Sequence, residues 1–265
     1  MLKVSGVRKV FGQGTVNENI ALRDVDLELD AGEFVTVIGS NGAGKSTLLN
    51  SIAGTFPINK GSIEVNGIEL TGEPDYKRAG LIGRVFQDPL EGTAASMSIE
   101  ENLAMAADRG KRRGLSIGVD SERRDEFKEY LSLLGLGLED RLTDKVGLLS
   151  GGQRQSLTLL MATIAKPKVL LLDEHTAALD PKTAEQVIDL TNKIVGKHNL
   201  TVLMVTHDLT QALDMGTRTI MMDTGEIVLD IKGSARSHMT VEELLDKFAQ
   251  AQGKELTNDR MLLAQ

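Results

Sequence analysis

The sequence has no cysteine, so disulfides, zinc-thiolate sites and thiol catalysis are excluded. It also has no run approaching the roughly 20 apolar residues of a membrane span, and its N-terminus lacks a signal-peptide pattern. Basic residues are outnumbered, 30 against 38 acidic ones, and the formal charge of −8 argues against broad electrostatic binding to nucleic acid. Lys111-Arg112-Arg113 is the one basic cluster and is interpreted as a solvated loop. We expect a soluble cytoplasmic protein.

The 265 residues are 41% hydrophobic and 26% charged, which is ordinary for a globular protein of one large or two small domains. Alternating runs joined by Asn66-Gly67 and by Thr224-Gly225 predict two hairpins. Ser98 with Glu101, Asp120, and Asp180 before Pro181 each predict the start of a helix. The continuous apolar run 169–172 is typical of a parallel strand buried on both faces.

A glycine-rich stretch follows the apolar run 34–38 and precedes apolar residues at helical spacing. Its members are Gly39, Ser40, Asn41, Gly42, Ala43, Gly44, Lys45, Ser46 and Thr47. Strand, glycine loop and helix are the context of a phosphate-binding P-loop, in which backbone N–H groups and the helix dipole face an anion. Lys45 can reach the β- and γ-phosphates, and the Ser46 hydroxyl can bind Mg²⁺. The alternative, a flexible loop with an incidental lysine, leaves this full match unexplained, so we expect a nucleoside triphosphate site.

The apolar run 169–172 ends in two acidic residues, Asp173 and Glu174. Ligands of open α/β sheets bind outside the carboxyl ends of the strands. Asp173 fits the carboxylate that holds the metal through water, and Glu174 fits the group that polarises the attacking water. Two acidic residues at a strand end would be uninformative alone; behind a matched P-loop they indicate hydrolysis.

A second helix start, Leu149-Ser150-Gly151-Gly152-Gln153, offers N–H groups and a hydroxyl to an anion. In isolation it would be an ordinary helix cap. With the first loop about a hundred residues earlier, however, one domain can hardly bring both to a single nucleotide. Two copies arranged head to tail therefore become plausible.

With these motifs the sequence resembles the ATP-binding-cassette (ABC) ATPases, over nearly its whole length to about Gly233. LSGGQ, residues 149–153, is the most family-specific signal, beside GSNGAGKST (39–47) and LLLDE (170–174). Gln87 matches the glutamine loop, Asp180 ends the D-loop match, and His207 matches the switch histidine. Phe11 is placed like the aromatic residue that stacks on adenine, with a core aromatic as the rival interpretation.

The resemblance implies an α/β fold: a P-loop NTPase core with a mainly parallel sheet, an antiparallel β subdomain and an inserted α-helical subdomain. The implied ATPase domain is 1–233, with the helical subdomain at about 89–155, and 234–265 is a C-terminal helical extension whose default role is to cover the sheet. ATP would lie between the P-loop of one subunit and the residues Ser150, Gly151, Gly152 and Gln153 of the other. The subunits would form a homodimer or pair with a like subunit. His207 would contact the γ-phosphate. Ser46, Asp173 and Gln87 would bind Mg²⁺, directly or through water, and Gln87 would also sense the attacking water.

The sequence departs from the family at His175, where proline usually follows the acidic pair. Histidine there could loosen the turn that carries the base, and its ordinary pKa lies near neutrality. We still expect ATP hydrolysis, because Asp173, Glu174 and Asp180 are intact. We hypothesise that the rate of hydrolysis depends on pH, since His175 adds a group that titrates near neutrality.

The resemblance further implies an ATP-hydrolysing subunit that energises transport of a small solute from the cytoplasmic face of the membrane. The expected partners are integral membrane permease subunits and an extracytoplasmic binding protein, with no nucleic acid. Its apolar residues make the stretch 89–145 the candidate permease contact, although several must pack inside: Leu90, Met97, Ile99, Leu103 and Met105. A separate ATPase chain favours an importer, and the neighbourhood of Glu174 is similar to amino-acid uptake systems. The alternative is an ATP switch acting in export or on ribosomes or nucleic acid.

Overall fold

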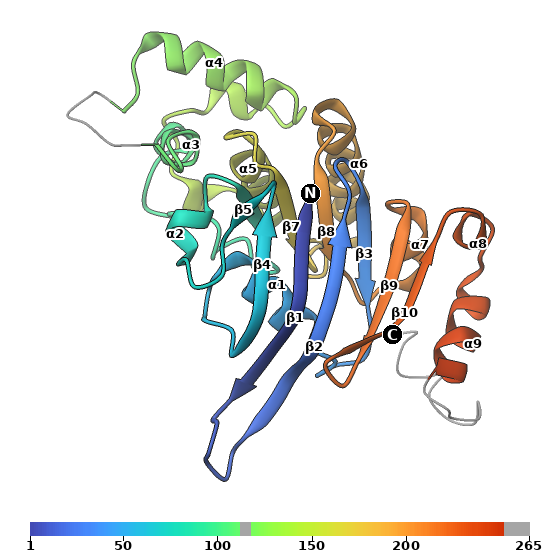
Figure 1. Cartoon of the computed structure of the whole chain (residues 1–265). Coiled ribbons are helices and arrows are strands. Elements are labelled where there is room, and N and C mark those ends of the chain that lie inside the picture. The colour runs from blue at the N-terminus through green and yellow to red at the C-terminus, as the bar shows by residue number, and fades with distance from the viewer. Residues whose placement is uncertain (112–117, 252–265) are drawn as a thin grey trace. The chain divides into compact units, whose positions relative to one another are not determined.

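The computed structural model describes residues 1–111 and 118–251, and the chain forms two compact units (Figure 1). Unit 1 combines Met1–Arg78 with the chain from Leu200 onward, and unit 2 is Ala79–Asn199. Within the described ranges, no helix is both long and apolar enough to cross a membrane. Arg112 and Arg113 of the basic cluster lie outside the described residues.

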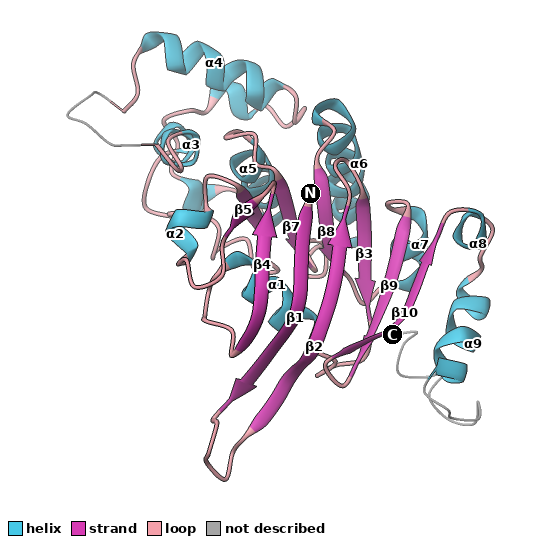
Figure 2. Ribbon diagram, in the orientation of Figure 1, coloured by secondary structure: helices cyan, strands magenta, loops and turns pink. Residues whose placement is uncertain are grey.

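Unit 1 contains a four-stranded antiparallel sheet in the order β2-β1-β4-β5 (Figure 2). Its strands are β1 (Leu2–Phe11), β2 (Asn19–Leu29), β4 (Lys60–Val65) and β5 (Ile68–Glu69). The predicted hairpin at Asn66-Gly67 joins β4 to β5, with φ of 55° and 78° at its two turn residues. Positive φ at both positions is what a type I′ turn requires, and an Asn-Gly pair adopts it easily. The antiparallel β subdomain is confirmed.

Unit 1 also holds four strands that are mainly parallel. They are β3 (Phe34–Ile38), β8 (Thr201–Val205), β9 (Arg218–Asp223) and β10 (Glu226–Lys232). β3 pairs in parallel with β8 and with β9, and the predicted hairpin at Thr224-Gly225 returns β10 antiparallel to β9. Every residue of β3 and β8 is buried. Polar side chains of these two segments can therefore reach solvent or a ligand only beyond the ends of the strands.

Short helices complete unit 1. They are α1 (Lys45–Ala53), α2 (Asp75–Arg78), α7 (Leu209–Asp214), α8 (Ser234–Ser237) and α9 (Val241–Ala251). Leu244 and Phe248 of α9 pack in one cluster with Met221 and Ile231, on β9 and β10. The part of the predicted extension up to Ala251 thus covers the sheet, as expected. The four-residue helices α2 and α8 are too short to leave a periodic pattern and were not predicted.

Unit 2 contains the parallel pair β6 (Ile82–Val85) and β7 (Val169–Asp173). Its helices are α3 (Ile99–Ala107), α4 (Ser121–Ser132), α5 (Gly151–Thr163) and α6 (Pro181–His198), with 3-10 turns η1 (Leu138–Asp140) and η2 (Val146–Leu148). The predicted caps are confirmed: Ser98 and Glu101 form a capping box, and Asp120 and Asp180 accept backbone N–H groups. Helices and parallel strands together match the predicted α/β class.

The helices α3, α4 and α5 share a core of their own. Phe127 and Leu131 of α4 are fully buried against Leu157 of α5. Two of the apolar residues considered for a permease contact, Ile99 and Leu103, are fully buried in this core and serve packing. Leu90 and Met105, by contrast, are 51% and 40% exposed.

The aromatic centre of this core gives the first prediction. Phe127→Ala should lower the free energy of unfolding of unit 2 by about 3–5 kcal/mol, because it leaves a cavity among side chains that cannot collapse fully. Leu148→Ala, at a side chain that is 72% exposed, should change it by less than about 0.5 kcal/mol. Urea unfolding followed by circular dichroism measures both; equal effects would show that Phe127 is not central to the helical core.

Candidate functional site

In unit 1 the glycine-rich loop leaves the buried end of β3 and enters α1. Gly39 has φ of 147°, and a Cβ there would lie 2.2 Å from the Met222 carbonyl oxygen. Gly44 has φ of 99°, and a Cβ there would lie 2.7 Å from the Ala21 carbonyl oxygen. The loop can follow this path against β9 and β2 only if both residues lack side chains.

The start of α1 is electropositive. Its N-cap is Gly44, with no side-chain hydrogen bond to the first N–H groups and no acidic residue in the first turn. Lys45 is only 6% exposed, and its ammonium donates to the carbonyl oxygens of Gly39 at 2.7 Å and Ser40 at 3.1 Å. Ser46 is exposed beside it. N–H groups without a side-chain cap, a helix dipole and a buried ammonium on one loop make a site for an anion such as phosphate.

His207 lies at the same edge of the sheet as this loop. Val37 of β3 and Val205 of β8 are register partners, so the two parallel strands end together. The Thr206 N–H donates to the Val37 carbonyl oxygen at 3.1 Å, which ties the segment after β8 to β3. His207 follows as an exposed side chain. The fold of unit 1 therefore brings the predicted histidine to the edge where the loop begins.

Phe11, at the end of β1, is not a core residue, since it is 39% exposed. Its ring meets the Phe56 ring edge to face, with 5.3 Å between centroids. The Lys9 ammonium lies 4.8 Å from the Phe11 centroid and 4.6 Å from that of Phe56. The exposure removes the core-aromatic interpretation and leaves a ring on the surface of unit 1.

In unit 2, Gln87 and Asp173 share the corresponding edge of the β6–β7 pair. Val85 and Leu172 are register partners; Gln87 is exposed two residues beyond the first, and Asp173 follows the second directly. An unpredicted residue joins them here: Arg84 Nη2 lies 3.3 Å from Asp173 Oδ2, with both side chains largely buried. The Arg84 guanidinium also lies 4.4 Å from the Phe86 ring centroid.

Burial raises the pKa of Asp173, and the Arg84 charge opposes that rise. Arg84 thus compensates the desolvated carboxylate. In the sequence, Arg84 looks like any polar residue of a strand with one exposed face. Only its distance to Asp173 on the neighbouring strand identifies it as the partner of that carboxylate. Glu174, the next residue, has φ of 42°, in the left-handed region that non-glycine residues seldom adopt. A strained acidic residue at a strand end is typical of functional turns.

His175 is a correction to the expected pH sensitivity. Its side chain is 1% exposed, and Nε2 lies 3.2 Å from the Thr191 hydroxyl on α6. Burial lowers the pKa of His175 to about 4, so the imidazole is neutral at physiological pH. The hypothesis that it titrates near neutrality is wrong, because the side chain is buried. The sequence did not indicate this burial, since it does not show that the side chain turns inward.

Gln155 is a second residue that the sequence did not single out. It is fully buried in α5, and its amide donates to the His175 carbonyl oxygen at 2.6 Å and the Phe86 carbonyl oxygen at 3.2 Å. The first contact fixes the turn after Glu174, and the second fixes the residue before Gln87. One side chain therefore links α5 to the segments that carry two predicted functional residues.

The predicted second anion loop begins α5. Ser150 Oγ accepts from the Gln153 N–H at 3.3 Å, and Gln153 Oε1 accepts from the Ser150 N–H at 3.2 Å. In the single chain this is an ordinary capping box. A Cβ on Gly152 would lie 2.1 Å from Thr183 Cγ2, at the start of α6. Gly152 thus lets the start of α5 approach α6, whose cap is Asp180.

The chain is similar in sequence to known proteins. A family model described as ABC transporter matches residues 22–177. The tyrosine transport ATP-binding protein of Clostridioides difficile is 46% identical over 251 residues, covering 95% of this chain and all of the relative. The methionine import ATP-binding protein MetN of Escherichia coli O157:H7 is 35% identical, covering 95% of this chain and 71% of MetN.

Solved structures agree with these sequence comparisons. A dimeric post-hydrolysis state of the ATP-binding cassette MJ0796, bound to ADP and phosphate, matches with a TM-score of 0.75. Its sequence is 32% identical, and the match covers 88% of this chain and 98% of that one.

The double hydrogen bond of Gln155 gives the second prediction. Gln155→Leu should lower the free energy of unfolding by about 1–3 kcal/mol, because it removes the donor from a buried carbonyl group and from a partly buried one. The control is Gln186→Leu, the same change at an exposed position of α6, which should alter it by less than about 0.5 kcal/mol. Chemical denaturation measures both; a neutral Gln155→Leu would mean that this network contributes little.

Proposed function

The chain belongs to the ABC transporter family as one of its ATP-hydrolysing subunits, and from that premise we propose that it powers the import of an amino acid or a similar small molecule. The observation that carries the proposal is the full-length match to a relative named for tyrosine transport. The match to a methionine import ATPase supports the same cargo class and direction. The ATPase itself would not touch the cargo.

The loop from Gly39 to Thr47 would hold the nucleotide phosphates. Its N–H groups and the Lys45 ammonium supply the positive charge that a triphosphate requires. Phe11, exposed at the end of β1, would stack on adenine. Mg²⁺ prefers oxygen ligands, and the Ser46 hydroxyl, the Asp173 carboxylate and the Gln87 amide oxygen are of that kind. When bound, the ion would neutralise phosphate charge.

Hydrolysis would depend on groups at the strand ends. Glu174 would accept a proton from the attacking water, His207 would donate a hydrogen bond to the γ-phosphate, and Gln87 would orient the water. Arg84 would keep the Asp173 carboxylate compensated while it awaits the metal. Gln155 would hold the Glu174 turn in register with the Gln87 segment through the carbonyl groups that it binds.

A second copy of the chain, or a like subunit, would complete each site. The helix start from Ser150 to Gln153 would offer its first N–H groups to a nucleotide, and the Ser150 hydroxyl, which accepts from the Gln153 N–H in the capping box, keeps its own hydrogen to donate. The dimeric MJ0796 cassette bound to ADP and phosphate supports such an arrangement. ATP would then favour the dimer through contacts absent from the monomer.

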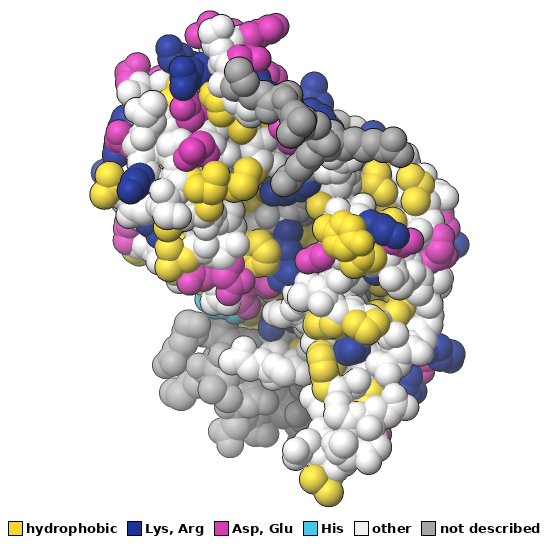
Figure 3. Space-filling view, turned by 90° about the vertical axis from the view of Figure 1, so that its left-hand side faces the viewer, with side chains coloured by type: hydrophobic (Ala, Val, Ile, Leu, Met, Phe, Trp, Pro, Cys, Tyr) yellow, Lys and Arg dark blue, Asp and Glu magenta, His cyan; other side chains and the backbone are white. Residues whose placement is uncertain are grey.

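The partners would be integral membrane permease subunits, which the ATPase would contact at the cytoplasmic face of the membrane, and an extracytoplasmic binding protein. The candidate contact lies in unit 2, where Leu90 and Met105 are exposed. Figure 3 shows that hydrophobic side chains on the drawn face stand in separate groups among acidic and basic ones. Small apolar groups with a charged rim suit a docking contact with another protein.

The third prediction concerns the proposed base. Glu174→Gln should reduce the ATP hydrolysis rate by about 10²–10⁴-fold while ATP binding persists, because the amide cannot accept the proton. The variant should also accumulate an ATP-bound dimer, measurable by gel filtration. Glu185→Gln, on the exposed surface of α6, serves as the control and should keep the normal rate. Normal turnover in Glu174→Gln would remove Glu174 from this role.

The fourth prediction concerns transport. Tagged Glu174→Gln protein with ATP and Mg²⁺ should retain a multi-span membrane protein from detergent-solubilised cells, because the trapped dimer stays engaged. Lys45→Ala protein, which should bind ATP poorly, is the control for membrane proteins that are retained without an ATP-bound dimer. Ribosomes or DNA-bound proteins without a permease would instead support the alternative of an ATP switch and contradict import.

A further inference from the structure

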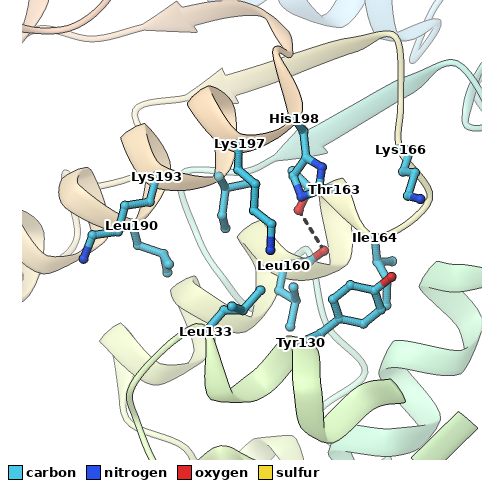
Figure 4. Close-up of a pocket in the computed structure, with 11 residues that line it drawn as sticks. Tyr130, Leu133, Leu160, Thr163, Ile164, Lys166, Leu190, Lys193, Lys197 and His198 are labelled. Atoms are coloured by element: carbon cyan, nitrogen blue, oxygen red, sulfur yellow. Dashed lines mark hydrogen bonds between the residues drawn. The ribbon is translucent and has the colours of Figure 1, made fainter. Parts of the chain in front are cut away.

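A pocket of about 120 Å³ opens between the C-terminal ends of α4, α5 and α6 in unit 2 (Figure 4). It is separate from the proposed ATPase residues, which lie at the other ends of α5 and α6. Its apolar lining comes from Tyr130, Leu133, Leu160, Ile164, Leu190 and Ile194. Leu160, Leu190 and Ile194 are buried and form fixed walls, whereas Leu133 is 47% exposed at the mouth.

Four cationic or titratable side chains also line this pocket: Lys166, Lys193, Lys197 and His198. Figure 4 shows Lys197 reaching from α6 toward Leu133 and Leu160, with the His198 ring beside Thr163. None of the ion pairs in the described part of the chain includes these lysines or His198. Burial first, then the charges of Lys197 and Lys166, lowers the pKa of His198, so the charges of both lysines reach this histidine.

Two acidic residues close to the lining residue Tyr130, Glu126 and Glu129, lie on α4. The Tyr130 hydroxyl donates to Glu126 at 3.2 Å, and Glu129 also acts on that hydroxyl. Neither glutamate lines the pocket. The mouth is therefore positive over an apolar floor in a protein whose overall formal charge is −8. Such a concentration of unpaired positive charge beside apolar walls is complementary to a ligand with an apolar body and an anionic end.

The dimensions restrict the body of that ligand. An apolar cavity of about 150 Å³ holds a benzene molecule, so this pocket suits one ring or a short branched chain. A carboxylate at the mouth could accept hydrogen bonds from a lysine ammonium and relieve the repulsion among the cations. A free amino acid fits less well, because its ammonium group would face Lys166 and Lys197.

We propose that the pocket between α4, α5 and α6 binds a small organic monoanion, with a ring-sized apolar body held by Leu160, Leu190 and Ile194 and a carboxylate held by Lys166 and Lys197. This ligand class is distinct from the nucleotide and from a zwitterionic cargo. The proposal does not depend on the proposed function, since it uses residues that the ATPase reaction does not.

Calorimetric titration of the full chain with 3-phenylpropionate tests the proposal. We expect a Kd of about 1 mM or tighter, with weaker binding of 3-phenylpropan-1-ol, which lacks the charge, of acetate, which lacks the ring, and of phenylalanine, which adds an ammonium. Equal binding of the alcohol or of acetate, or no binding of 3-phenylpropionate below about 10 mM, would overturn the proposal.

Variants place the binding in this pocket. Lys166→Gln with Lys197→Gln should raise the Kd by about fivefold or more, since it removes the charge that meets the carboxylate. Leu133→Ser should weaken binding through the apolar body. Lys128→Gln, an equal charge change on the exposed face of α4, should leave the Kd unchanged. All these side chains are on the surface, and an unchanged midpoint of thermal unfolding verifies the fold. A Kd that is insensitive to the double variant would contradict the assignment.

Discussion

A parallel strand that is buried along its whole length can present polar side chains only where it ends. β3 and β8 have no exposed residue, and β7 becomes partly exposed only at Asp173. The predicted site residues accordingly lie in the segments at or after the strand ends: the glycine-rich loop and His207 in unit 1, and Gln87 and Asp173 in unit 2. Register pairs at the strand ends or one residue before them keep each set at one edge.

Burial also explains the hydrogen-bond partners of two cationic side chains, Lys45 and Arg84. A buried ammonium or guanidinium must be compensated, since an isolated buried charge is costly. Lys45 meets this need with the carbonyl oxygens of its own loop, and Arg84 meets it with the Asp173 carboxylate. In both places the partners are oxygen atoms that accept from the buried cation, next to residues proposed to hold phosphate or metal.

Much of the fold was predictable because it is written in local chemistry. Asn66-Gly67 adopts the positive φ angles that its turn demands, and Ser98, Asp120 and Asp180 cap helices as their side chains favour. The glycine-rich loop and the acidic strand end were predictable for the same reason. Which functional side chains act together on ATP stays a prediction.

Tertiary contacts account for what the sequence did not reveal. His175 turns inward to Thr191, Gln155 binds two carbonyl groups from distant segments, and Arg84 crosses to β7. Each partner is at least sixteen residues away in the chain, so no local pattern records it. The buried Ile99 and Leu103 show the same limit, since helical spacing cannot distinguish a core face from a docking face.

The central claim is that each ATP is hydrolysed between the glycine-rich loop of one chain and the Ser150 helix start of another. Mixing Lys45→Ala and Ser150→Arg proteins in equal amounts and measuring ATP hydrolysis tests it most directly. Each variant should be inactive alone, whereas the mixed dimer contains one site with an intact loop from one chain and an intact helix start from the other. The account predicts that activity returns on mixing. Activity that stays at the sum of the two separate proteins would contradict it.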